Sequence, residues 1–447
     1  MPNKHFLYGL IGLSALHLAI TLPLLSAPGV GNYYDEAVYH YPSVLSIRQH
    51  WPRLDFISDV ISPISPGYHY FLAGLSLLTG ADLMKMRLIN DFLSMLIPLV
   101  LFSWLARDLS LARSFWLVLP VLFCSNFLKA SCRVVTDNAA LLLTLLTLAG
   151  VFLLPSRGWR GSLPGVTAGL AVLCRQLTLW LEAPLLLQSF LHPASVDDEK
   201  GHHSKTIPAM AGPGVFLIRL LPLGCIAFLY SKWDGLVPPI WQTPSGNAST
   251  APAAYILTLF VFFSAPFLLA LGRLGRPKQL DSISIALVIL LGLALALISP
   301  NTWNHEYGRW GGRLWDLSRK VPAMGDRSSL FIVLSPLGAL TVYFLFRLLV
   351  ENTSREKALL WLMSFVAWTA SFCTSRNIFQ RYFEAQILVF LVVATGLIIA
   401  PHPAWRPQRW AMFLLGALLV GTDLVEIYVP VFYGANAGHQ LYQEYGH

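Results

Sequence analysis

Two adjacent acids, Asp35 and Glu36, follow the first long apolar segment and lie near the start of a polar stretch from Asn32 to His69. A carboxylate beside a bilayer is costly in free energy, so it is usually retained for a function. Such a carboxylate can act as a general base toward a hydroxyl group. Asp35 could also cap a helix that begins at Glu36, because Asp is a favoured N-cap residue. The two roles are compatible.

Further charged residues border or interrupt apolar runs. Asp59 lies shortly before a Ser-Pro pair and also suits a turn. Asp137 or Thr136 can cap the helix expected to follow them. Arg175 and Arg381 each need an anion or the membrane interface to offset their charge. Because a guanidinium can hold phosphate through two parallel hydrogen bonds, these arginines predict a phosphate-binding site.

The stretch 301–327 is dense in aromatic and charged residues. Aromatic faces beside polar side chains suit a sugar, although an interfacial aromatic belt gives the same enrichment in Trp and Tyr. Such a belt does not explain His305, Glu306, Arg309 and Arg313. The chain has no GxGxxG, P-loop or HExxH motif. A lipid-linked phosphate donor therefore fits better than a nucleotide held in a soluble domain.

The composition indicates that membrane helices carry these residues. The 447 residues are 55% hydrophobic and 12% charged, with a mean hydropathy of +0.59, whereas soluble domains average about 25% charged residues. The net charge of +8 suits cytoplasmic loops and lipid phosphates. Long basic runs with interleaved aromatics are absent, so no nucleic-acid partner is expected. The five cysteines show no metal-ligand or disulfide spacing and are expected to be small core side chains.

A segment that crosses a bilayer needs about 20 apolar residues. This length predicts about thirteen segments, of which the first is expected to be an uncleaved helix and the pair near 164–191 a short bent hairpin. The stretch 66–80 is shorter and predicts a helix along the membrane surface. The predicted segments are 6–26, 88–106, 114–128, 138–154, 164–174, 177–191, 213–230, 253–272, 281–300, 328–349, 358–374, 382–400 and 411–430.

Short basic loops are expected on the cytoplasmic side of the membrane, where the positive-inside rule applies. These loops contain Arg107/Arg113, Arg157/Arg160, Arg273/Arg276/Lys278, Arg355/Lys357 and Arg406/Arg409. The other side then carries the first outer loop 27–87, the loops 231–252 and 301–327, and the residues singled out above. The predicted fold class is an all-α polytopic membrane protein with about 12 to 13 transmembrane helices and surface helices in the first outer loop.

In order along the chain, these motifs resemble those of the GT-C class of membrane glycosyltransferases, which use polyprenyl-phosphate sugars. Within that class the chain is most similar to the eukaryotic dolichyl-phosphate-glucose α-1,2-glucosyltransferase family, which adds the terminal glucose to the lipid-linked N-glycan precursor. Loop 301–327 departs from the family pattern, with only Glu306, Arg309 and Trp315 loosely similar. The residues that carry the resemblance are Asp35-Glu36 with His40 and Pro42, Asp59 to Tyr68, Met86-Arg87 to Asn90, Val135-Thr136-Asp137, Arg175-Gln176 and Arg381-Tyr382-Phe383.

The resemblance implies an inverting hexosyltransferase with a GT-C fold, in which Asp35 is the general base. The donor would be a polyprenyl- or dolichyl-phosphate hexose, with glucose favoured, and the acceptor a hydroxyl of a lipid-linked glycan. No metal or other cofactor is expected. A catalytic module would span 1–230, including loop 27–87, and a second transmembrane module 231–447. The implied substrate-binding residues are Glu36, His40, Asp59, Tyr68, Asp137, Arg175, Gln176, Glu306, Arg309, Arg381 and Tyr382.

Two alternatives stay open. Another GT-C transferase, acting in protein O-glycosylation or on lipid A or cell-wall sugars, would carry similar first-loop acids. A transporter or flippase for a lipid-linked glycan would be expected to show an inverted repeat and broken helices in matching halves, and the sequence shows neither. The departures from the eukaryotic motifs favour a prokaryotic plasma membrane over the endoplasmic reticulum, with the active site on the non-cytoplasmic face.

Overall fold

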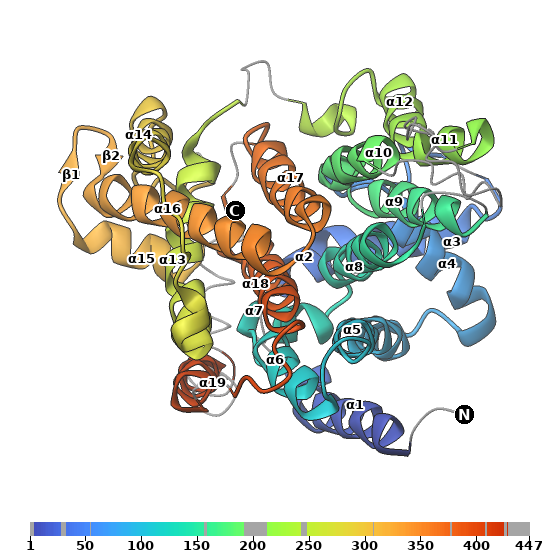
Figure 1. Ribbon diagram of the computed structural model, residues 1–447. Helices are drawn as coiled ribbons and strands as arrows, with labels where there is room; N and C mark the ends of the chain where they lie inside the picture. Colours follow the sequence, from blue (N-terminus) through green and yellow to red (C-terminus); the bar gives the residue numbers. More distant parts are fainter. Residues whose placement is uncertain are drawn as a thin grey trace.

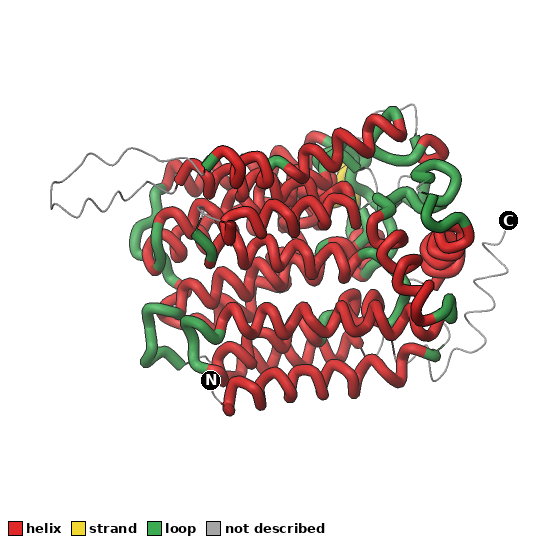
Figure 2. The backbone as a smooth tube through the Cα atoms, turned by 90° about the vertical axis from the view of Figure 1, so that its right-hand side faces the viewer, coloured by secondary structure: helices red, strands yellow, loops and turns green. Residues whose placement is uncertain are grey.

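The computed structural model describes residues 4–27, 33–53, 55–155, 159–191, 212–242, 248–306, 308–375, 378–406, 409–423 and 427. Helices dominate these residues and run side by side in one bundle, with loops gathered at its ends (Figure 1, Figure 2). A short antiparallel hairpin pairs β1 (Ala323–Met324) with β2 (Arg327–Ser328).

The helices fall into three groups along the chain. The first group is α1 (Lys4–Leu25), α2 (Tyr33–Asp35), the π-helical turn η1 (Glu36–His40), α3 (Tyr41–Gln49) and α4 (Gly67–Thr79). The second is α5 (Leu83–Leu105), α6 (Leu111–Leu122), α7 (Ser125–Ser131), α8 (Asp137–Leu153), η2 (Trp159–Ser162), α9 (Leu163–Cys174), η3 (Gln176–Leu181), α10 (Glu182–Leu191), α11 (Pro213–Arg219) and α12 (Leu221–Trp233). The third is η4 (Pro239–Trp241), α13 (Ala251–Leu271), η5 (Gly272–Gly275), α14 (Ser282–Ile298), α15 (Arg313–Lys320), α16 (Ser329–Asn352), α17 (Arg355–Phe372), η6 (Gln380–Tyr382), α18 (Glu384–Ile399) and α19 (Arg409–Asp423).

The predicted all-α polytopic membrane architecture is confirmed. Five helical segments are long and apolar enough to cross a membrane, namely α1, α5, α13 with η5, α16, and η6 with α18. Two bent pairs, α6 with α7 at 75° and α11 with α12 at 46°, raise the number to seven if each pair is one span. Every predicted apolar segment coincides with a helix among the described residues. Fewer helices than predicted reach full span length, because several predicted segments are short or broken helices.

Local sequence signals explain where several helices begin and end. Side-chain oxygens of Asp82, Asp281 and Ser354 accept backbone N–H groups at the starts of α5, α14 and α17. The predicted short helix over 66–80 is confirmed as α4, which ends at Gly80 with a φ of 87°. A glycine suits this end because a left-handed conformation strains residues with a Cβ atom.

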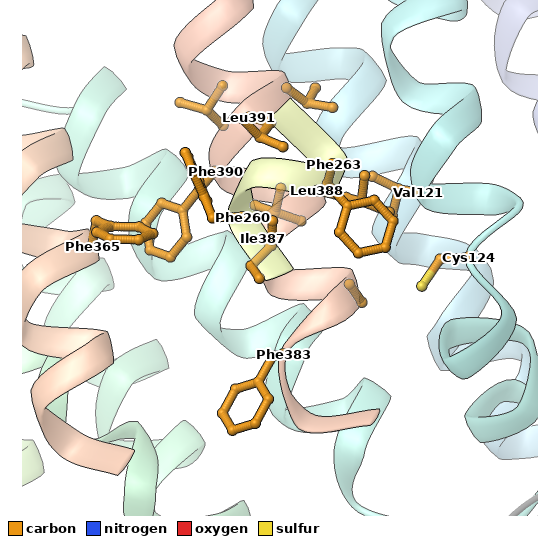
Figure 3. Close-up of a cluster of buried hydrophobic side chains, with 14 of the residues drawn as sticks. Val121, Cys124, Phe260, Phe263, Phe365, Phe383, Ile387, Leu388, Phe390 and Leu391 are labelled. Atoms are coloured by element: carbon orange, nitrogen blue, oxygen red, sulfur yellow. The ribbon is translucent and has the colours of Figure 1, made fainter. Parts of the chain in front are cut away.

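The core centres on α18, in which every residue is buried. A helix that is apolar on all sides belongs in the middle of a bundle. Figure 3 shows aromatic side chains of α13, α17 and α18 meeting there, with Phe260 and Phe365 at a ring distance of 5.0 Å and Phe365 and Phe390 at 5.5 Å. The same core includes Val121 and Leu185, so residues on both sides of position 230 share it.

The cysteines behave as predicted. All five are free thiols; Cys124, Cys132, Cys174 and Cys225 are buried, and Cys373 is partly buried.

Basic loops predicted to share one side of the membrane contact one another. The guanidinium of Arg113 donates to the carbonyl oxygens of His402 and Pro403, and the His402 ring is hydrogen-bonded to the Asn352 side chain at 2.8 Å. Helix α5 leads from this end of the bundle to the loop 27–87 at the other end. The acid-bearing loop and these basic loops therefore lie at opposite ends of the bundle.

Close packing of α16 on α13 at Gly338 generates a stability prediction. A Cβ atom at Gly338 would overlap the backbone oxygen of Leu257. Gly338→Ala should therefore lower the thermal midpoint of the purified protein, since overpacking costs about 1–3 kcal/mol. The control is Gly224→Ala in α12, where a Cβ would meet nothing within 4 Å and alanine favours the helix. Equal midpoints for the two variants would contradict this packing.

Candidate functional site

Asp35 faces an arginine from the far end of the chain. It ends α2 and precedes the π-helical turn η1, a kind of turn that recurs at functional sites. The side chain of Asp35 makes no capping hydrogen bond at this turn. Its Oδ2 atom instead lies 2.5 Å from Nη2 of Arg381, with both side chains about one-fifth exposed. The carboxylate is thus turned toward a cation and remains accessible.

Arg175 and Asp137 form a second ion pair. Nη1 of Arg175 lies 2.6 Å from Oδ1 of Asp137. Arg175 has extended backbone between α9 and η3, so its side chain leaves a break in the helix. Asp137 opens α8, where Thr136 at the N-cap makes no side-chain capping bond. Asp137 therefore serves as the counter-ion of an arginine that interrupts an apolar stretch.

Tyr382 joins the two ion pairs. Its ring centroid lies 4.2 Å from the guanidinium carbon of Arg175 and 5.0 Å from that of Arg381. Nη2 of Arg381 also donates to the Tyr382 hydroxyl at 3.2 Å. Cation–π contacts of this kind help to hold guanidinium groups in place. We call these five residues (Asp35, Asp137, Arg175, Arg381 and Tyr382) the charge cluster.

A pocket of about 640 Å³, including its open mouth, adjoins the charge cluster. Asp137, Arg175, Arg381 and Tyr382 form its polar side. The rest of the lining mixes apolar side chains, among them Leu141, Trp180, Trp368 and Phe372, with uncharged polar ones such as Asn138 and Gln386. A pocket that places two guanidinium groups beside an apolar wall suits an anion with a hydrophobic tail.

Glu36 lies inside the fold, away from the pocket lining. Its side chain is 1% exposed. Oε1 accepts hydrogen bonds from Nε of Arg87 at 2.9 Å and from the backbone N–H of Val134 at 2.8 Å, and Oε2 contacts Nη2 of Arg87. Nε of Arg133 lies 3.9 Å from Oε2. These contacts link loop 27–87 to α5 and to the turn before α8.

Three other predicted site residues form hydrogen bonds to other residues of the protein. Gln176 accepts from the backbone and the hydroxyl of Ser65 at 2.9 and 3.0 Å. Asp59 accepts from Ser46 at 2.7 Å and lies 2.6 Å from the His50 ring. The Tyr68 hydroxyl donates to Asn90 at 2.7 Å. None of the three lines the pocket.

Glu306 and Arg309 are also absent from the pocket lining. Glu306 is exposed. Arg309 is buried and donates to the carbonyl oxygen of Pro300, while its backbone pairs with that of Asn304. Trp315, in the same loop region, is buried and donates to the carbonyl oxygen of Ile378 at 2.6 Å. This region thereby supports the segment that leads into η6 and Arg381.

His40 forms a buried pair with His69. The rings stack with centroids 5.2 Å apart, and Nδ1 of His40 lies 2.9 Å from Nε2 of His69. One ring must donate and the other accept, so at least one is neutral. Burial lowers the pKa of His40 to about 4; the Asp137 charge opposes this shift, and the charges of Arg381 and Arg175 add to it. Burial and then the His40 charge lower the pKa of His69.

The apolar walls of the pocket gave no functional signal in the sequence. Trp180, Trp368 and Phe372 look like ordinary apolar helix residues until the fold places them beside two arginines. Within the described ranges, no group of three or more His, Cys, Asp or Glu side chains is placed to hold a metal ion.

The buried contacts of Glu36 predict that substituting Glu36 destabilises the protein much more than substituting its neighbour Asp35. Glu36→Gln should lower the thermal midpoint strongly, because removing one partner of a buried ion pair costs about 3–5 kcal/mol. Asp35→Asn should cost much less, since its pair with Arg381 is partly exposed. Thermal unfolding of the two variants in the same detergent tests this. Equal losses would show that Glu36 does not anchor the loop.

The histidine pair predicts acid destabilisation. Above pH 6.5 both folded and unfolded chains hold a neutral His40; between pH 6.5 and about 4 the unfolded chain binds a proton that the folded chain excludes. The free energy of unfolding should therefore fall as the pH is lowered from 6.5 to about 4. The fall should be up to about 1.4 kcal/mol per pH unit for each such group. His40→Asn should flatten the fall, whereas His305→Asn, which removes an exposed imidazole, should not. A wild-type stability that is level from pH 6.5 to 4 would refute the prediction.

Comparison with protein-family models and with curated proteins returns no match. Among solved structures, the chain is similar to the crystal structure of the Archaeoglobus fulgidus oligosaccharyltransferase in the apo form, with a TM-score of 0.44 and 13% sequence identity. The match covers 98% of this chain and 56% of that one, so the chain spans little more than half of the length of the archaeal protein.

Proposed function

We propose that this chain is an inverting membrane glycosyltransferase that moves a hexose from a polyprenyl-phosphate donor to a hydroxyl of a lipid-linked glycan. The observation that carries the proposal is the contact between Asp35 and Arg381 at 2.5 Å beside a pocket lined by Arg175, Arg381 and several apolar side chains. The three parts of this site match three needs of the reaction: a base, cations for the phosphate, and apolar side chains beside them that a lipid chain can contact.

Donor binding would change the partner of Arg381. Arg381 is paired with Asp35, and Arg175 is paired with Asp137. A phosphodiester in the pocket would draw the Arg381 guanidinium to its oxygens, where two parallel hydrogen bonds are available. Asp35 would then lose its counter-ion and become a stronger base. Binding of the donor would thereby activate the group that deprotonates the acceptor.

The transfer step balances atoms and charge. Asp35 accepts the proton of the acceptor hydroxyl as its oxygen bonds to the anomeric carbon from the face opposite the phosphate. The bond from that carbon to the phosphate oxygen breaks, and polyprenyl phosphate leaves with the electron pair. Asp35 loses one negative charge as the phosphate gains one, so the net charge of the site does not change. Arg381 and Arg175 would stabilise the charge that develops on the phosphate.

The remaining assignments belong to the same proposal. Glucose is the favoured hexose, and the polyprenyl carrier would be dolichyl in the eukaryotic setting. The site would face the non-cytoplasmic side. A prokaryotic plasma membrane is favoured over the endoplasmic reticulum. Basic loops gathered at the end of the bundle away from Asp35 support this orientation.

The proposal predicts separate effects of the base and of the phosphate-binding cation. Asp35→Asn should lower kcat by about 100-fold or more, the usual contribution of a general base. Arg381→Gln should also lower kcat by about 100-fold and raise the KM for the donor. Asp55→Asn, in the same loop, should retain activity, because Asn can still accept from the backbone N–H groups of Ile57 and Ser58.

The assay follows labelled hexose from polyprenyl-phosphate glucose, mannose or arabinose into lipid-linked glycans extracted from the source membranes. Transfer from glucose alone would support the full proposal, whereas preference for another sugar would retain the mechanism with a different donor. Near wild-type turnover of Asp35→Asn would exclude Asp35 as the base. Movement of labelled lipid across the membrane without a new glycosidic bond would replace the transferase proposal with a flippase.

A further inference from the structure

Three aromatic rings form a continuous row beside Asp35. Tyr34 and Tyr39 meet edge to face at 5.8 Å, and Tyr39 meets Trp241 edge to face at 5.5 Å. Tyr34 precedes Asp35 directly in the chain and is 54% exposed, and Trp241 is 36% exposed. None of the three rings lines the pocket that holds Arg175 and Arg381. We call these three residues the aromatic row.

The loop that carries Trp241 is held in place by hydrogen bonds. Nε1 of Trp241 donates to the carbonyl oxygen of Ile61 at 2.9 Å. The neighbouring Gln242 donates through Nε2 to the carbonyl oxygens of Trp233 at 2.7 Å and Val237 at 3.1 Å. A ring brought from a distant part of the chain is thereby fixed against Tyr39 while one-third of its surface stays exposed. Core packing alone does not require this arrangement.

The aromatic row is electrically neutral apart from the adjacent Asp35. Burial raises the pKa of Tyr39 to about 12, aided by its side-chain hydrogen bond with Tyr34 and by the charge of Asp35. Its hydroxyl is therefore protonated at physiological pH and can donate a hydrogen bond. The row offers apolar ring surface with hydroxyl groups at its edge, which suits a neutral ligand that has both kinds of surface.

We propose that the aromatic row binds a hexose ring of the acceptor glycan and holds its reacting hydroxyl at Asp35. A pyranose presents C–H groups on its face and hydroxyls around its rim, which match an aromatic face and phenol hydroxyls. Tyr and Trp supply rigid contact area at a low cost in conformational entropy. The inference rests on the proposed function. Asp35 would lie between an outer acceptor platform and the inner donor pocket.

An interfacial belt that contacts lipid head groups is the competing role for these rings. The two roles differ in what the rings bind. A belt would influence insertion and stability in the bilayer, whereas an acceptor platform would bind free sugar rings selectively over acyclic polyols of similar polarity. A belt would also leave the KM for the acceptor unchanged.

The test uses purified full-length protein in lipid nanodiscs, with maltotriose as the sugar probe and sorbitol as the acyclic control. Saturation-transfer NMR should show transfer to the ring protons of maltotriose and little to sorbitol. Tyr34→Ala and Trp241→Ala should each lower that signal by about fivefold, the worth of one aromatic contact. Trp159→Leu, which removes another exposed aromatic ring, should leave the signal unchanged. If Trp241→Ala fails to fold, the largely exposed Tyr34 still provides the test.

The outcomes separate this inference from the proposed function. Asp35→Asn should lower the rate of transfer by about 100-fold or more and retain the maltotriose signal, because binding needs the rings and not the base. In the transfer assay, the two ring variants should raise the KM for the acceptor and leave the KM for the donor unchanged. Absence of a maltotriose signal, or a signal equal in wild type and both ring variants, would overturn the inference. Maltotriose binding by a protein that transfers no sugar would overturn the proposed function and the acceptor role of the aromatic row, and would retain the row as a sugar-binding surface.

Discussion

The site depends on the buried carboxylate of Glu36. Arg87 and Arg133, which lie beside that carboxylate, also donate to the carbonyl oxygen of Leu25 at the end of α1. The N–H of Val134 completes the contact. One anion thus ties α1, α5 and the turn before α8 to the start of loop 27–87. Because Asp35 is joined to Glu36 by a peptide bond, anchoring the second acid positions the first at the mouth of the pocket.

Charge pairing explains how the pocket can hold two arginines. An arginine in an apolar environment is strongly unfavourable unless an anion accompanies it. Asp35 and Asp137 supply that anion for Arg381 and Arg175, and Tyr382 contacts both guanidinium groups. Each guanidinium group of the pocket thus has a carboxylate partner within the protein. The acids are therefore as necessary to the construction of the pocket as the arginines.

Much of the helical architecture could be predicted from the sequence, because apolar length decides which segments become membrane helices. The grouping of Asp35, Asp137, Arg175 and Arg381 at one end of the bundle also followed from the predicted spans. Their pairing could not be predicted, since it depends on tertiary packing between distant segments. The resemblance gave Asp35 and Glu36 different roles, but the burial of Glu36 could not be predicted. Adjacent residues on a helix point in different directions, and only packing decides which one is buried. Trp180 and Phe372 carried no signal because a pocket wall and a core use the same apolar residues.

The short helices and the pocket have a common physical cause. Irregular backbone at membrane depth is tolerated where protein or a cavity surrounds it. Arg175 lies at the break between α9 and η3, and Arg381 lies in η6 just before α18. At each break a long cationic side chain lies against the pocket. A continuous apolar helix would direct that side chain into the lipid or into the core. Both arginines of the pocket therefore come from points where regular α-helix is interrupted, so these two interruptions are part of its construction.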